Sequence, residues 1–295
     1  MKRNYTAPDM ERLERVEKLQ ITYPRLERLI EQIAHCHEFS KIAAEPQCLF
    51  ITGDMGVGKT KMTERYERQH PRYETEDGTV VPILNTAIPV PATVKGLATV
   101  LLKNLGDPAA TKGTVVSLTF RLQKLIKDCR VELIILDEFQ HVIDRESLKI
   151  LLTVSDWLKM LLNETKVPLV LIGMPSSTTI LEANPQLRRR FAAREKFEPF
   201  GWKSSAQINE FRMLLKMIED CLPLDGSSKL ADTSMAYRFH CASGGFIHSV
   251  MKLVRYGTGI AIKEGADRLT LDILAAAYDK CLAADMPDVK NPFAS

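Results

Sequence analysis

A glycine-rich stretch, followed at once by a lysine and a threonine, runs from residue 53 to residue 60. Gly53 and Gly58 are separated by four residues, and Lys59 and Thr60 follow them, after a short apolar run and before a helical pattern. Glycines let the backbone turn tightly enough for successive N–H groups to face an anion, and the start of a helix adds its positive end. The spacing predicts a P-loop (Walker A) that binds nucleotide phosphates through Gly53, Asp54, Met55, Gly56, Val57, Gly58, Lys59 and Thr60.

Two acidic residues supply the carboxylates that such a site needs. Asp137 ends the most apolar run of the chain, and Glu138 follows it, in the Walker B arrangement. We expect Lys59 to reach the β and γ phosphates, and Thr60 and Asp137 to hold Mg²⁺. Glu138 is then placed to orient the attacking water. The alternative is two exposed acids after a core strand, but the P-loop upstream favours a site that binds ATP with Mg²⁺ and hydrolyses it.

The elements that position these residues follow from the apolar patterns. Strands are predicted at 48–52, 79–90, 132–139, 167–175 and 196–198, and helices at 9–40, 60–69, 93–105, 114–129, 146–163, 203–220, 229–241, 246–263 and 270–283. Alternating strands and helices predict an α/β fold with a parallel sheet flanked by helices and ligands at the carboxyl ends of its strands. The predicted domains are an N-terminal helical extension (1–40), an α/β ATPase domain (41–202), and a helical lid with a tail (203–295).

The composition excludes several other classes of protein. No apolar stretch approaches the roughly 18 residues of a membrane-spanning helix, and the N-terminus is too charged for a secretory signal. The six cysteines are scattered without a CxxC pair, which indicates free thiols in a reducing compartment. We therefore expect a cytoplasmic protein without a membrane partner.

Positive charge is concentrated in one segment. Residues 93–130 hold seven basic and two acidic side chains, a net charge of +5, whereas the whole chain carries +3. On a helix at 114–129, basic and hydroxyl side chains share the face opposite an apolar one, which suits contacts to phosphate oxygens. The alternative is an ordinary solvated face. The expectation is sequence-tolerant binding of double-stranded DNA through Lys103, Lys112, Thr119, Arg121 and Lys124.

The order of these features resembles that of the AAA+ ATPases, in which neighbouring subunits share each nucleotide. The segment "NPQLRRRF" (184–191) lies where that class carries its arginine finger, and the resemblance implies this role for Arg189 or Arg190. AAA+ proteins often place a polar sensor residue at the end of the fourth strand. Here only Ser176 or Ser177 could replace it. In the lid, His248 stands nearest to the usual arginine, and its usual neutrality near pH 7 is compatible with slow hydrolysis.

Further stretches resemble the TniB/TnsC-type transposition regulators, AAA+ ATPases related to MuB. They are "ITYPRLERLIEQI", "LLKNLGDPAATKGTVVSLTFRL", "IILDEFQHV", "NPQLRRRF" and the terminal "NPF". The resemblance implies ATP-dependent assembly on duplex DNA as a ring or helical filament. It also implies recruitment of a DDE transposase, with a target-selection protein as a further partner, and disassembly on hydrolysis.

Two other functions fit the same fold. A helicase loader or protein-remodelling AAA+ ATPase would act mainly on a protein partner. A nucleotide-switch signalling module would have no role on DNA, but it usually adds a sensor or effector domain. The basic segment and the "NPF" tail favour the transposition regulator.

Overall fold

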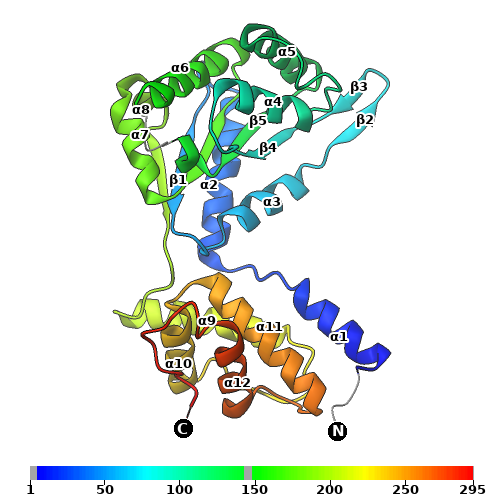
Figure 1. Cartoon of the computed structure of the whole chain (residues 1–295), viewed down its shortest axis with the longest axis vertical. Helices are drawn as coiled ribbons and strands as arrows, with labels where there is room; N and C mark the ends of the chain where they lie inside the picture. Colours follow the sequence, from blue (N-terminus) through cyan, green and yellow to red (C-terminus); the bar gives the residue numbers. More distant parts are fainter. Residues whose placement is uncertain (1–4, 143–147, 295) are drawn as a thin grey trace. The chain divides into compact units, whose positions relative to one another are not determined.

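The computed structural model describes residues 5–142 and 148–294, which form two compact units (Figure 1). Residues 24–197 make up the first, here called the α/β unit. Residues up to Tyr23 and from Glu198 onward make up the second, here called the helical unit. This division differs from the predicted domains, because residues 1–40 do not form one extension: the chain passes from one unit to the other after Tyr23.

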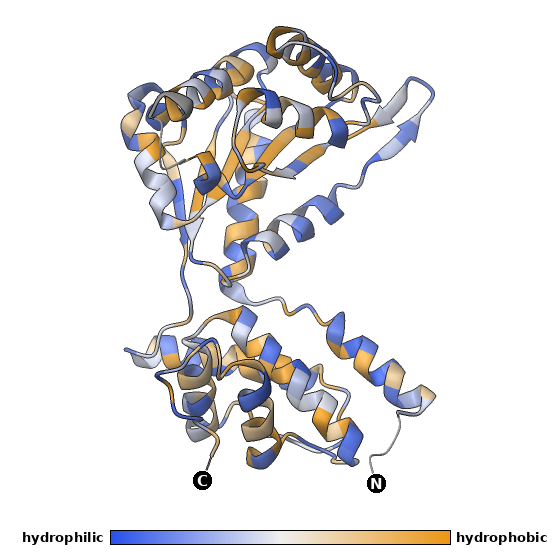
Figure 2. Ribbon diagram, viewed as in Figure 1, coloured by the Kyte–Doolittle hydropathy of each residue, from blue (hydrophilic) through white to orange (hydrophobic). Residues whose placement is uncertain are grey.

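A five-stranded parallel sheet is the centre of the α/β unit. Its strands are β1 (Leu49–Gly53), β4 (Ile83–Ala87), β5 (Leu133–Asp137), β6 (Leu169–Gly173) and β7 (Ala193–Phe197). They lie in the order β4-β5-β6-β1-β7, and every pairing is parallel. The three inner strands are buried along their whole length and are the hydrophobic strands of Figure 2. The carboxyl ends of β1 and β5, where the predicted site residues begin, therefore lie at one edge of this sheet.

Helices cover both faces of the sheet (Figure 1). They are α2 (Pro24–Ser40), α3 (Lys59–Gln69), α4 (Val94–Asn104), α5 (Val115–Asp128), α6 (Leu148–Thr165), α7 (Thr178–Ala183) and α8 (Pro185–Arg190), with 3₁₀ turns η1 (Phe139–Val142) and η2 (Pro175–Ser177). Ile134 and Leu136 join the apolar cluster formed with α4 to α8. Leu133 and Ile135 are equally buried, and because side chains alternate along a strand they face the side of α2 and α3.

Several segments differ from the predicted elements. The helix predicted at 9–40 is interrupted at residues 18–23, because one helix ends at Glu17 and α2 begins only at Pro24. The predicted strand at 79–90 is divided at Pro82 into β3 (Gly78–Val80) and β4, because proline cannot donate to a ladder. β3 pairs antiparallel with β2 (Tyr73–Thr75), a hairpin that the apolar pattern does not reveal. The first two residues of the helix predicted at 146–163 lie outside the described residues.

The helical unit combines both ends of the chain. Its helices are α1 (Ala7–Glu17), α9 (Ser205–Asp220), α10 (Thr233–Ser243), α11 (Ile247–Glu264) and α12 (Leu271–Cys281). A capping box of Thr6 and Asp9 begins α1, and the Arg12 side chain donates to the Pro223 carbonyl. Phe293 of the terminal "NPF" is buried against Phe239, with ring centroids 5.3 Å apart. Over the described residues, every helix is too short or too polar to cross a lipid bilayer.

Candidate nucleotide site and its surroundings

The P-loop connects β1 to α3 at the carboxyl end of the sheet. Gly56 and Gly58 have φ values of 86° and 105°, a left-handed region that favours glycine, and Gly58 is the N-cap of α3. A Cβ at Gly53 would lie 2.4 Å from the Phe197 carbonyl oxygen, so only glycine fits where β7 passes the start of the loop. The local backbone therefore has the shape that the spacing predicts.

Lys59 lies inside this loop. Its ammonium group donates to the carbonyl oxygens of Gly53 at 2.8 Å and Asp54 at 2.9 Å, and only 7% of the residue is exposed. Burial lowers the pKa of Lys59, while the carboxylates of Asp137, Glu138 and Asp54 oppose that shift. The P-loop backbone thus holds the Lys59 ammonium group at the place where it is predicted to bind phosphate.

Thr60 and Asp137 meet across the site. The Thr60 hydroxyl donates to Oδ2 of Asp137 over 2.8 Å, which joins the P-loop helix to the end of β5. Burial raises the pKa of Asp137, against hydrogen bonds from the Thr60 hydroxyl and the Glu138 N–H. A hydroxyl and a carboxylate side by side are the hard oxygen ligands that Mg²⁺ prefers, so the residues present fit this ion.

Glu138 follows Asp137 in a left-handed conformation, with φ 59°. Its N–H donates to Oδ1 of Asp137 at 2.8 Å, and its carboxylate accepts a hydrogen bond from the Gln140 amide. The next side chain, Phe139, is buried in the core. Because the backbone turns at Glu138, its partly exposed side chain and the buried side chain of Phe139 point in different directions. Sequence reasoning missed Gln140. The available signal was a polar residue two positions after the acidic pair.

The arginine cluster forms the last turn of α8. Arg188 and Arg189 are exposed, whereas Arg190 donates to the Glu45 carboxylate at 2.7 Å and to the Asn163 side chain at 3.1 Å. An arginine finger must be free to reach a neighbouring subunit's nucleotide. Of the two candidates, Arg189 meets that requirement better than Arg190.

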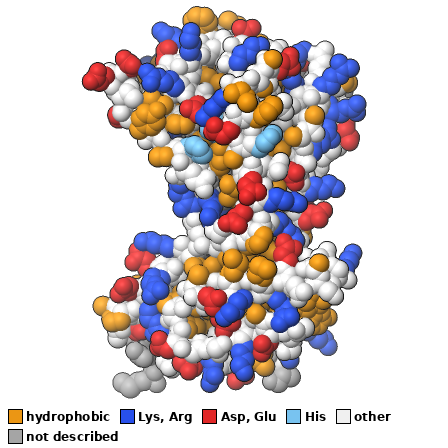
Figure 3. All heavy atoms as spheres, turned by 180° about the vertical axis from the view of Figure 1, so that it is seen from behind, with side chains coloured by type: hydrophobic (Ala, Val, Ile, Leu, Met, Phe, Trp, Pro, Cys, Tyr) orange, Lys and Arg blue, Asp and Glu red, His pale blue; other side chains and the backbone are white. Residues whose placement is uncertain are grey.

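Three of the five predicted DNA-binding side chains lie on the surface. Lys103 on α4, Lys112 in the following loop and Lys124 on α5 are all exposed. Phe120 is 70% exposed in the same segment, so the basic surface also carries an aromatic ring that the sequence analysis did not use. On the face drawn in Figure 3, by contrast, Lys and Arg side chains alternate with Asp and Glu side chains.

The structure corrects the prediction for Thr119. This residue is 8% exposed, and its hydroxyl accepts a hydrogen bond of 3.0 Å from the buried indole N–H of Trp157 on α6. Thr119 lies between Leu118 and Leu122, which are fully buried on the inner face of α5, while Val115 at the start of the helix is 39% exposed. Thr119 therefore belongs to the core and does not face DNA.

The Arg121 side chain forms four hydrogen bonds within its own chain. Its guanidinium donates to the Asp107 carboxylate at 2.8 and 3.1 Å, and to the carbonyl oxygens of Ala109 and Lys112 at 2.6 and 3.0 Å. Four of the five guanidinium N–H groups are thus used to hold the α4–α5 loop. A direct contact of Arg121 with DNA stays a prediction. The Arg121 side chain also stabilises the loop that carries Lys112.

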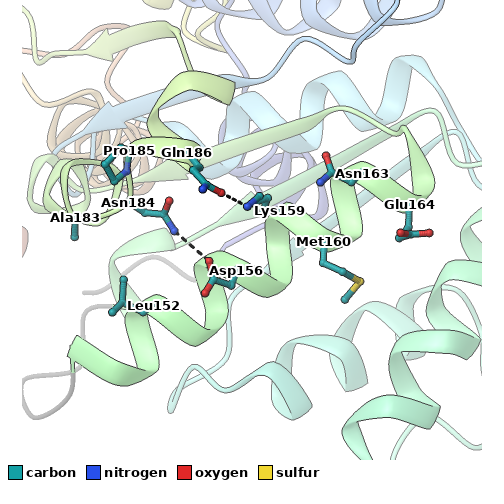
Figure 4. A pocket seen from close by; sticks show the side chains of 10 residues that line it. All are labelled: Leu152, Asp156, Lys159, Met160, Asn163, Glu164, Ala183, Asn184, Pro185 and Gln186. Carbon is teal, nitrogen blue, oxygen red and sulfur yellow. Dashed lines mark hydrogen bonds between the residues drawn. The ribbon is translucent and has the colours of Figure 1, made fainter.

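An open pocket of about 660 Å³ lies between α6 and residues 183–186, which run from the end of α7 into the start of α8 (Figure 4). Asn184 points toward Asp156, and Gln186 toward Lys159, so polar side chains bridge it. It shares no residue with the P-loop or the Walker B position. Asp156 and Glu164 in its lining make it a poor site for phosphates.

Comparison with known proteins identifies the family. The family model for bacterial TniB proteins matches residues 12–203, which is more than half of the chain. The chain belongs to the TniB family. No curated protein sequence matches this TniB-family chain significantly.

Solved structures confirm the fold. The Orc1 protein of Aeropyrum pernix, solved in complex with DNA, is similar with a TM-score of 0.65 at 15% identity, covering 91% of this chain and 69% of that one. Cdc6p from Pyrobaculum aerophilum gives a TM-score of 0.65 at 14% identity, covering 91% and 71%. RuvB of Thermotoga maritima gives 0.51 at 14% identity, covering 88% and 69%. This TniB-family chain has the P-loop AAA+ fold, with a C-terminal helical region.

The predicted sensor positions differ in their surroundings. Ser176 is exposed, whereas Ser177 is fully buried and its hydroxyl has no hydrogen-bond partner among the described residues. His248 is exposed in the first turn of α11, in the helical unit. Its role toward the nucleotide stays a prediction for this TniB-family protein.

Proposed function

We propose that this TniB-family protein is a Mg²⁺-dependent ATPase that assembles on duplex DNA when ATP is bound and leaves the DNA after hydrolysis. One observation carries the proposal. Thr60 and Asp137, which lie 77 positions apart, are brought to 2.8 Å beside a buried lysine at the P-loop. A hydroxyl, a carboxylate and an ammonium group at these positions are the groups that bind Mg²⁺ and nucleotide phosphates for phosphoryl transfer.

Each residue has a distinct role in this reaction. The loop N–H groups and Lys59 bind the phosphates, and Thr60 and Asp137 hold Mg²⁺. The bound ion would neutralise charge on the phosphate oxygens. Glu138 orients the attacking water, and Arg189 reaches the nucleotide of an adjacent copy, so that hydrolysis depends on assembly into a homo-oligomer.

DNA binding rests on the exposed lysines of the α4–α5 segment. Lys103, Lys112 and Lys124 offer ammonium groups for phosphate oxygens, which hold DNA without reading its sequence. Each subunit adds only a few such contacts, so affinity comes from many subunits along one duplex. That two structural neighbours, the Aeropyrum pernix Orc1 protein and Drosophila ORC, were solved bound to DNA supports this part of the proposal.

Family membership extends the proposal to transposition. The assembled protein would mark target DNA and recruit a DDE transposase, with a target-selection protein guiding where it loads. The assembly is a ring or a helical filament. Electron microscopy with duplex DNA and a slowly hydrolysed ATP analogue tests this directly, because rings or filaments threaded by DNA are expected.

Lys59→Ala tests whether ATP controls assembly. The variant is expected to lose nucleotide binding and, with it, DNA association. The control is Lys61→Ala, which removes an exposed lysine of the same helix that forms an ion pair with Glu64. Normal ATP-dependent loading of Lys59→Ala on DNA would disprove the mechanism.

Glu138→Gln separates binding from hydrolysis. The metal ligands remain, so ATP and Mg²⁺ binding is kept, while the water loses its orienting carboxylate. The variant is expected to hydrolyse ATP far more slowly and to stay on DNA longer. ATPase activity near the wild-type rate would remove Glu138 from its role.

The DNA contacts are tested by anisotropy across a salt series. Lys103→Ala/Lys112→Ala is expected to bind DNA weakly and to bind ATP normally. Lys61→Ala/Lys263→Ala removes the same charge from other exposed positions and serves as the control. If both double variants bind DNA like the wild type, a helicase loader or protein-remodelling ATPase becomes the better function.

A further inference from the structure

Gln140 connects the ends of two neighbouring strands at the catalytic edge of the sheet. It lies in η1, three residues beyond Asp137, and its amide NH₂ donates to Oε2 of Glu138. Its carbonyl oxygen accepts the N–H of Met174, the first residue after β6, at 3.0 Å. A single amide therefore bridges the Walker B glutamate and the end of the adjacent strand.

The end of β6 is shaped to receive this amide. A Cβ at Gly173 would lie 3.2 Å from Oε1 of Gln140 and 2.4 Å from Oγ of Ser177. Any larger side chain at this strand end would displace Gln140 or Ser177. β6 ends on a glycine, which has no side chain, and Gln140 brings a polar group to that end.

Glu138 is consequently held at both ends. Its left-handed backbone and its N–H bond to Asp137 fix where the side chain starts, and Gln140 fixes one carboxylate oxygen. A carboxylate has about four acceptor positions, so one bond from Gln140 leaves others for a water molecule. The uncharged amide donor orients the carboxylate and cannot itself act as a base.

We propose that Gln140 is the positioning residue of the ATPase site, holding the Glu138 carboxylate in its working orientation and coupling it to the end of β6. This inference rests on the proposed ATPase function. Gln140 acts through Glu138, and its side-chain hydrogen bonds within the described residues go to Glu138 and Met174 rather than to Thr60 or Asp137.

Gln140→Ala and Gln140→Glu test the inference through steady-state ATPase kinetics. General bases contribute about 10²–10⁴-fold, so losing the orientation of Glu138 is expected to lower kcat on the order of tenfold to a hundredfold, with KM nearly unchanged. Gln140→Glu keeps the shape and removes the donor near neutral pH. Its kcat should rise as the pH falls, because a proton shared by the two carboxyl groups restores the lost hydrogen bond.

The controls separate failure of the inference from failure of the proposed function. A wild-type protein that does not hydrolyse ATP refutes the proposed function itself. With an active wild type, an unchanged kcat in Gln140→Ala, or a Gln140→Glu pH profile parallel to the wild type, overturns the inference. Gln123→Ala, which removes an amide whose hydrogen bond in the described part of the chain goes to the Met160 sulfur, is expected to keep the wild-type kcat. If Gln140→Ala fails to bind a fluorescent ATP analogue, the isosteric Gln140→Glu decides.

Discussion

Replacing Arg121 by alanine is expected to destabilise the α/β unit, because it removes the hydrogen bonds that hold the α4–α5 loop. The guanidinium makes four hydrogen bonds, two of them to the Asp107 carboxylate. The Asp107 side chain is 9% exposed and that of Arg121 33%, so the variant leaves a nearly buried charge without its partner. A hydrogen bond to a charged group is worth about 1.5–3 kcal/mol, and the partial exposure of Arg121 limits the total to about 3 kcal/mol.

Thermal unfolding measures this loss. About 3 kcal/mol corresponds to a fall in Tm of roughly 6–12 °C for a unit of this size. Lys103→Ala, on the exposed side of α4, is expected to change the free energy of unfolding by less than about 0.5 kcal/mol while weakening DNA binding. The two substitutions thus separate stability from DNA affinity, which a combined variant would confuse.

A double-mutant cycle tests the cause. Asp107→Ala/Arg121→Ala removes both charges, so it should cost clearly less than the sum of the single variants. Additive costs, or an Arg121→Ala variant with the wild-type Tm, would refute the reasoning. The guanidinium would then be free for DNA, as the sequence alone had suggested.

Three further predictions follow from buried or exposed polar groups. Thr119→Val leaves a buried indole N–H unpaired and should cost about 1–3 kcal/mol in urea unfolding, with unchanged DNA anisotropy; weakened DNA binding by the folded variant would contradict the core assignment. Burial lowers the pKa of His37 below its ordinary 6.5, so stability should fall as pH decreases through that value, a slope that His37→Gln removes and the exposed His35→Gln keeps. Arg189→Ala should lower ATP hydrolysis on the order of a hundredfold or more, leaving ATP binding intact, whereas Arg190→Ala should mainly lower Tm; equal ATPase losses would contradict this division.

The P-loop and the Walker B pair could be located from the sequence because each depends on local order. A buried strand, a turn and a polar residue at fixed spacing are sufficient to place Lys59, Thr60 and Asp137. The alternation of strands and helices is local in the same sense, and the parallel sheet it predicts is confirmed. The order β4-β5-β6-β1-β7 depends on how the crossovers pack, which periodicity does not record.

Tertiary partners explain what the sequence missed. On a helical wheel Thr119 falls with Val115 and Leu122 on the apolar face, so its burial was within reach of the sequence, whereas the indole on another helix that pairs with its hydroxyl was not. The wheel also leaves Arg121 on a solvent face, because Asp107 and the loop carbonyls come from outside that helix. Gln140 was missed for a similar reason, because its partner Met174 directly follows a strand that is distant in the sequence.

The place of α1 has a consequence for synthesis of the chain. α1 packs on α11, and Arg255 of α11 donates to the Val16 carbonyl, yet the whole α/β unit separates the two in sequence. An isolated helix of 11 residues is marginal in water. During translation α1 therefore leaves the ribosome long before α11, and it lacks this packing partner until more than two hundred further residues have been made. The α/β unit can complete its core before the helical unit can close around α1, so the order of folding is expected to be the reverse of the order in which the two units begin to emerge.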